Sequence, residues 1–167
     1  FPITHGLMPY IAKDILLLDE NGLGQLLASF SCGAVMGSLI LAATPSQKYA
    51  TQLMLINLVV WYIMLAIFSW IDSRTGALVV LFFVGIAHSF AMTSMSVSLL
   101  GFTNELVRGR VMGVRVLAIY GVPLGLLASG FLIEYFGYLS FMYMYVVLGI
   151  LVTVIIGAKW RSSIWHT

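Results

Sequence analysis

Hydrophobic residues fill long stretches of this chain, and short segments between them hold nearly all of the charged side chains. A bilayer core about 30 Å thick needs roughly 20 apolar residues per helical crossing. Stretches without Asp, Glu, Lys or Arg that meet this length lie at residues 23–41, 51–70, 76–100, 116–136 and 139–158. Membrane β-barrels instead alternate apolar and polar residues in segments of about ten. We therefore predict an all-α fold, a polytopic bundle with about five full transmembrane helices.

Residues 1–18 come before the first full stretch and begin with the apolar segment FPITHGLMPYIA. This segment is only about half as long as a crossing. It has no initiating Met and no basic region followed by a cleavage site, which a signal peptide would have. We interpret residues 1–18 as the remnant of a truncated helix and an outer loop. Residues 1–167 are then expected to form a single transmembrane domain, one half of a larger membrane protein.

The composition supports a membrane location. Hydrophobic residues make up 61% of the chain, charged residues only 8%, and the mean hydropathy is +1.05. These values lie far outside those of a soluble domain. The net charge of +2 comes from loop cations and gives no surface for nucleic acid. The single cysteine, Cys32, lies inside a predicted span and excludes an intrachain disulfide.

The loop charges predict an orientation, because Lys and Arg in short loops stay on the cytoplasmic side. One side of the predicted bundle carries Lys48, Arg108, Arg110, Arg115, Lys159 and Arg161. The other side carries only Lys13 and Arg74. We therefore expect a multi-pass membrane protein with a cytoplasmic C-terminus.

The stretch at residues 76–100 is the most polar of the five, and it carries His88, Ser89 and Thr93. Polar groups in hydrocarbon are costly unless they face protein or water, so this helix is expected in the interior. His88 has three open readings: it binds substrate, carries a proton, or bonds a neighbouring helix. The sequence has no metal-ligand cluster, phosphate-binding glycine loop or nucleophile–base pair. We expect no catalytic residue, no metal and no cofactor, and therefore no enzyme.

Small residues recur at four-residue spacing, as at Gly33 and Gly37, and this spacing lets helix backbones approach closely. The segment from Gly121 to Gly125 also holds Pro123, which frees a backbone carbonyl in mid-span. This segment is either a packing surface or the hinge of a moving helix.

Two ordered motifs resemble the C-terminal six-helix half of major facilitator superfamily transporters, in particular bacterial enterobactin-exporter-like permeases. The first is R-G-R-x-x-G at residues 108–113, and the second is G-x-P-x-G-x4-G, with Gly121, Pro123, Gly125 and Gly130. The resemblance covers essentially the whole chain. It implies that residues 1–18 end the seventh helix and that the five full spans are helices eight to twelve. It also implies that the seventh, eighth, tenth and eleventh helices surround a cavity, with the ninth and twelfth outside.

The resemblance implies a secondary active transporter of the bacterial inner (plasma) membrane that exports a small molecule by alternating access. Its expected partners are the lipid bilayer, the small-molecule substrate, an N-terminal six-helix half and protons as the coupling ion. We assign substrate contact to His88, Ser89, Thr93, Gln25 and Tyr120. Two alternatives stay open: an uptake permease of the same fold, and a structural or regulatory membrane subunit that transports nothing.

Charge is concentrated at residues 104–115, where Glu105 precedes Arg108, Arg110 and Arg115. We predict that these residues occupy a cytoplasmic turn. Anionic lipid headgroups attract each such cation by roughly 1 kcal/mol, so the turn would be anchored to the membrane. The three-residue spacing of Glu105 and Arg108 also allows an ion pair. The group serves either as an anchor alone or also as a gate that docks on carbonyls at helix ends.

Overall fold

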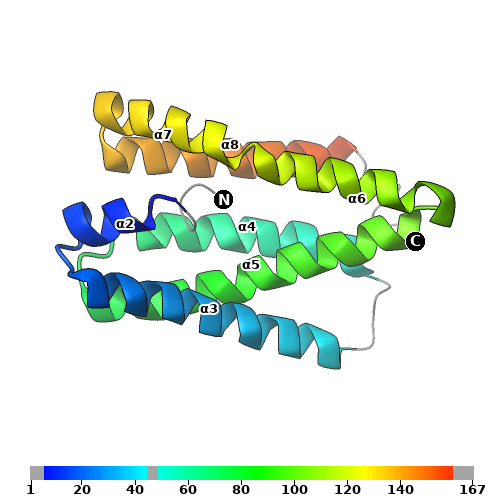
Figure 1. The fold of residues 1–167 in the computed structure, drawn as a ribbon, viewed down its shortest axis with the longest axis horizontal. Coiled ribbons are helices and arrows are strands. Elements are labelled where there is room, and N and C mark those ends of the chain that lie inside the picture. Colours follow the sequence, from blue (N-terminus) through cyan, green and yellow to red (C-terminus); the bar gives the residue numbers. More distant parts are fainter. Residues whose placement is uncertain (1–5, 45–48, 160–167) are drawn as a thin grey trace.

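The computed structural model describes residues 6–44 and 49–159, and the described residues form helices joined by short connections (Figure 1). A short helix α2 (Met8–Tyr10) continues into the π-helix η1 (Ile11–Ile15). The long helices are α3 (Glu20–Ala43), α4 (Ala50–Phe68), α5 (Arg74–Phe102), α6 (Glu105–Tyr120), α7 (Val122–Phe136) and α8 (Tyr138–Lys159). The described residues contain no strand. The predicted all-α fold is therefore confirmed.

The five predicted spans are confirmed as five helical segments long and apolar enough to cross a membrane. Each observed helix starts and ends within a few residues of its prediction, except that the fourth span starts 11 residues earlier than predicted, at Glu105 in place of residue 116. That span runs from Glu105 to Phe136, which is 32 residues, because α6 and α7 follow each other with only Gly121 between them. Side-chain caps fix three of the helix starts: Asp19 accepts from the amide of Gly22, Ser73 from that of Gly76, and Asn104 from that of Leu106.

The prediction that the arginine group lies in a turn is wrong. Glu105, Arg108, Arg110 and Arg115 all belong to α6, and the connection from α5 consists of Thr103 and Asn104. The physical reason is the cap at Asn104, which satisfies the amide of Leu106 and starts a helix directly after the short connection. Helix α6 therefore begins at Glu105, before the apolar part of its span.

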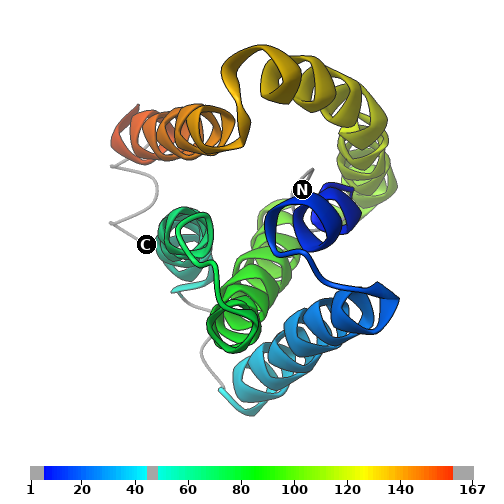
Figure 2. The ribbon, with the colours of Figure 1, turned by 90° about the vertical axis from the view of Figure 1, so that its left-hand side faces the viewer.

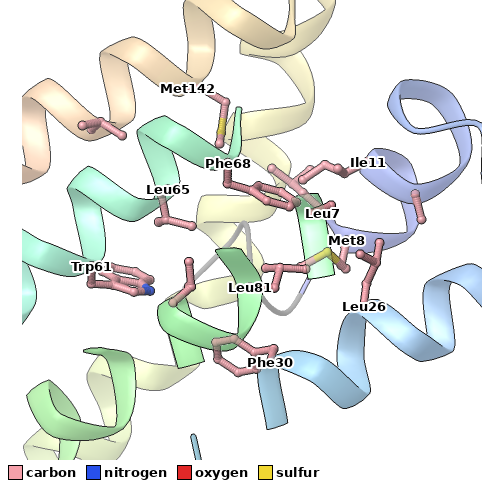
Figure 3. Packing of buried hydrophobic residues seen from close by; sticks show 14 of the residues in the cluster. Leu7, Met8, Ile11, Leu26, Phe30, Trp61, Leu65, Phe68, Leu81 and Met142 are labelled. Carbon is pink, nitrogen blue, oxygen red and sulfur yellow. The ribbon is translucent and has the colours of Figure 1, made fainter. Parts of the chain in front are cut away.

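Helix α5 is the most buried of the five spans, with 33% of its apolar window inside the bundle, as the sequence predicted for an interior helix. It packs against α3 on one side and against α4 on the other, and α4 in turn packs against α8 (Figures 1 and 2). The side chains of Leu26, Leu65 and Leu81, one each from α3, α4 and α5, are fully buried in the shared core (Figure 3). Met8 and Ile11 from the N-terminal segment close the same core at one end.

The α6–α7 segment arcs along the edge of the bundle and leads into α8, against which α7 packs (Figure 2). Only 6% of its apolar window is buried. Its few inner contacts come from α7, where Ser129 is buried and Leu126 packs against the core. The outward face carries a row of large apolar side chains: Leu106, Leu117, Tyr120, Leu124, Leu127, Phe131 and Tyr135. This spacing follows a helical face, so α6–α7 offers one continuous apolar surface to lipid or to another helix.

Candidate functional site

His88 lies on α5 between two aromatic rings from the neighbouring helices. Its ring centroid is 5.5 Å from that of Phe30 on α3 and 5.7 Å from that of Trp61 on α4. Both pairs are tilted, and the His88 side chain is half-buried. Figure 3 shows Phe30 on α3 and Trp61 on α4 among the buried side chains of the core. His88 is therefore the point where α3, α4 and α5 meet through their rings.

The aromatic contacts continue from Trp61 to α8. Trp61 lies 5.0 Å from Tyr62, Tyr62 lies 5.7 Å from Tyr145, and Tyr145 stacks on Phe141 at 6.2 Å, all between ring centroids. Gly149 makes the α4–α8 contact possible, because a Cβ there would lie 2.2 Å from the Tyr62 ring. Sequence reasoning missed this chain of rings. The only available signal was the presence of Trp and Tyr within otherwise aliphatic spans.

Ser89 and Thr93 follow His88 on α5 and both face towards α3. Ser89 is buried, and a Cβ built on Gly37 of α3 would lie 3.1 Å from the Cβ of Ser89. Thr93 lines a cavity of about 200 Å³ between α3, α4 and α5, together with Ser38, Thr44 and Ser94. Ser94 is almost completely buried, and its hydroxyl has no hydrogen-bond partner among the described residues. Ser94 is not among the five assigned pathway residues, because the sequence alone does not distinguish it from the four other hydroxyls near it on the same helix.

Most other hydroxyls in the spans are satisfied inside the bundle. Ser96 donates to the carbonyl of Met92, and Thr153 donates to that of Gly149. Two further bonds join helices: Ser29 on α3 donates to the carbonyl of Leu78 on α5, and the hydroxyls of Thr51 and Ser98 are 3.0 Å apart. These bonds remove the cost of placing a hydroxyl in hydrocarbon. They make much of the polarity of α5 structural.

Gln25 and Tyr120 lie away from the His88 region. Gln25 is exposed near the start of α3, where its amide oxygen accepts from Arg74 Nη2 at 2.5 Å and from Nε at 3.2 Å. Tyr120 is 73% exposed at the end of α6. The structure thus brings His88, Ser89 and Thr93 together on the inner faces of three helices. Neither Gln25 nor Tyr120 belongs to the ring contacts of His88 or to the lining of the cavity beside Thr93.

The break between α6 and α7 falls at Gly121, next to Pro123. The amide of Gly121 donates to the carbonyl of Ala118 at 3.2 Å, which is a tighter turn than the α-helix makes, and the regular pattern resumes where the amide of Gly125 donates to Gly121. Pro123 has no amide hydrogen to donate to the preceding turn. Gly130, further along α7, has no atom of another residue within 4 Å of the position of a Cβ.

The arginines of α6 differ in their surroundings. Arg108 Nη2 donates to the carbonyl of Leu100 near the end of α5, at 3.4 Å, whereas Arg110 is exposed. Arg115 is half-buried, and its Nε has no hydrogen-bond partner within residues 6–44 and 49–159. Arg108 and Arg115 are seven residues apart and share the helix face that turns towards the bundle. Among the described residues, no ion pair joins the Glu105 carboxylate to the Arg108 guanidinium.

Within the described residues, no group of three His, Cys, Asp or Glu side chains is placed to hold a metal ion.

Comparison with known proteins shows the family of this chain. No curated protein and no solved structure matches this chain. The family model of the Major Facilitator Superfamily matches residues 3–163, which is nearly the whole chain. With its five membrane-spanning segments, the chain therefore belongs to the major facilitator superfamily of membrane transporters.

Proposed function

We propose that this chain forms the C-terminal six-helix half of a secondary active transporter that exports a small molecule across a bacterial inner membrane, with its C-terminus in the cytoplasm. The family membership supports a transporter, and the motifs at residues 108–113 and 121–130 support the export class. The apolar outer row of α6–α7 is suited to contact with lipid or with an N-terminal six-helix half.

The observation that carries the proposal is the break in α6–α7. It divides a 32-residue span into segments of 16 and 15 residues, so it lies close to the middle. The span is also sparsely packed, with 6% of its apolar window buried. A helix that can bend at its centre without disrupting a core is what alternating access needs, since one wall must open to each side in turn.

The proposal gives the five assigned pathway residues different parts. Tyr120 is 73% exposed next to the break, in the outward row of α6–α7, and would meet a substrate in a cavity between this half and the N-terminal half. His88 and Ser89 pack against α3 and α4, so they reach a substrate only when one of these helices shifts, whereas Thr93 lines the cavity of about 200 Å³. Gln25 holds Arg74 at one end of the bundle and would act at the entrance. We further propose protons as the coupling ion, with His88 as the titratable group within the described spans.

One alternative is a structural or regulatory subunit without transport, and a specific observation favours it. Many hydroxyls of the spans bond within the bundle, as at Ser29, Ser96 and Thr153, and so present nothing to a substrate. An uptake permease of the same fold would share every feature described here, because direction depends on coupling.

Cysteine labelling separates transporter from static subunit without knowledge of the substrate. In the complete protein with Cys32→Ser, Tyr120→Cys should react with a membrane-impermeant thiol reagent in intact cells and also in everted vesicles. Leu148→Cys, an exposed mid-span position on α8, is the control and should react in neither. Adding Pro123→Ala to the Tyr120→Cys variant should reduce labelling of the introduced cysteine from one of the two sides. Labelling of Tyr120→Cys from one side only, or from neither, would contradict alternating access.

A further inference from the structure

A cavity lies at the end of the bundle opposite the arginines of α6. Its volume is about 530 Å³, which falls within the range of small-ligand sites. Two connections form it: that between α4 and α5, and that between α7 and α8 (Figure 1). Gly137 lies in the second connection and has a backbone φ of +80°, a conformation that residues other than glycine rarely adopt. None of the five assigned pathway residues lines this cavity.

Aromatic rings and one carboxylate dominate the cavity lining. Trp70 and Tyr143 meet edge to face, with centroids 6.2 Å apart and planes at 84°, and Tyr138 lies nearby in the same lining. Trp70 is 69% exposed, so much of its ring is available to a ligand. The ring faces of Trp and Tyr attract a cation by about 0.5–2 kcal/mol.

Asp72 is the charged residue of the lining, and it has no ion-pair partner among the described residues. Arg74, two residues further on, directs its guanidinium to Gln25 instead. Lys13, the other cation expected on this side, lines a different cavity with Asp19 and Glu20. The hydroxyl of Ser69 is already bonded to the carbonyl of Ala66. The negative charge of Asp72 is therefore left for a ligand.

We propose that this cavity binds an organic ammonium group, held by the Asp72 carboxylate and the rings of Trp70 and Tyr143. An anion is disfavoured, because no cation lines the cavity. A Ca²⁺ or Mg²⁺ ion is also disfavoured, since one carboxylate supplies too few of the six or more oxygen ligands that these ions need. An ammonium group can come from a dissolved solute or from the headgroup of phosphatidylethanolamine.

Trp and Tyr are also common at membrane interfaces, where they need no ligand. The test must therefore depend on charge and not on aromatic content. The complete protein is purified in detergent, and binding of choline is compared with that of 3,3-dimethyl-1-butanol, a neutral molecule of the same shape. Native mass spectrometry measures retention of phosphatidylethanolamine against phosphatidylglycerol.

We expect saturable binding of choline, of phosphatidylethanolamine, or of both, with little binding of the neutral analogue or of phosphatidylglycerol. Asp72→Asn should weaken binding about tenfold, the effect of roughly 1.4 kcal/mol. Glu134→Gln removes an exposed acid outside the cavity lining and should have no effect. Trp70→Phe should keep most of the binding, and Trp70→Leu should lose it.

The two arms identify the source of the ammonium group. Choline binding indicates a solute site, and retention of phosphatidylethanolamine alone indicates a lipid site. The proposal is overturned if neither ligand binds, if the neutral analogue binds as well as choline, or if Asp72→Asn binds like the wild type while eluting as the same folded species. Transport is not measured, so the outcome is independent of the proposed function.

Discussion

Gly33 on α3 lies directly against the backbone carbonyl of Phe82 on α5, so that a Cβ at Gly33 would be 1.9 Å from that oxygen. The contact is reciprocal, because a Cβ at Gly85 on α5 would be 2.1 Å from the carbonyl oxygen of Phe30 on α3. Gly37 continues the contact one turn later, at 2.9 Å from the carbonyl oxygen of Ile86. Since these obstacles are backbone atoms, side-chain adjustment cannot make room, and the helices must separate if a methyl group is added.

Gly33→Ala should therefore destabilise the protein. We expect a loss of about 1–3 kcal/mol, the usual cost of overpacking, seen as a lower midpoint of thermal unfolding in detergent. Gly24→Ala on the same helix is the control, because nothing lies within 4 Å of its Cβ position, and it should leave the midpoint unchanged or raise it. Equal midpoints for Gly33→Ala and Gly24→Ala would show that α3 and α5 do not pack this closely.

His88→Ala and His88→Phe separate ring packing from chemistry. The alanine variant removes the ring between Phe30 and Trp61, so we expect a lower unfolding midpoint and less protein in the membrane. The phenylalanine variant keeps a ring and should restore most of the stability, but it cannot carry a proton. If His88 serves in proton coupling, transport by the complete protein is lost in both variants. Full transport with His88→Phe would make His88 a packing residue.

Arg108→Lys and Arg110→Lys should differ in their effects. Arg108 reaches the carbonyl of Leu100, and lysine cannot reproduce the fork of donors that a guanidinium offers, whereas the exposed Arg110 needs only its charge to attract lipid. We expect correct insertion of both variants and reduced transport only for Arg108→Lys, measured in cells that contain equal amounts of the complete protein. Unchanged transport in Arg108→Lys would leave membrane anchoring as the role of the group.

Orientation can be tested by thiol labelling in the Cys32→Ser background. Ser73→Cys, an exposed position before α5, should react with an impermeant reagent from outside intact cells. Ser46, which is predicted to lie on the cytoplasmic side, would be the matching position, but it lies outside the described residues. Gly109→Cys serves instead, since Gly109 is exposed on α6 and its Cβ position is open. It should react only after permeabilisation, and the reverse pattern would invert the predicted topology.

The hydrophobic pattern alone determined the fold class and the positions of five spans, because the length of an apolar run is set by bilayer thickness and needs no knowledge of tertiary contacts. The interior position of α5 was also predictable, since its Ser, Thr and His side chains would be too costly against lipid. Family membership followed from two motifs of fixed spacing, at residues 108–113 and 121–130, and the match over residues 3–163 agrees with it.

Tertiary structure decided which side chains meet. The composition of α5 does not say whether His88 faces water or rings, because that depends on how α3 and α4 are rotated about their own axes, and the structure places Phe30 and Trp61 against it. The helical state of Arg108 and Arg115 depended on a cap at Asn104, a local hydrogen bond that hydrophobicity does not report. The cavity at Asp72 and Tyr143 joins residues about 70 positions apart, and pairing at such separation is set by packing, not by local sequence.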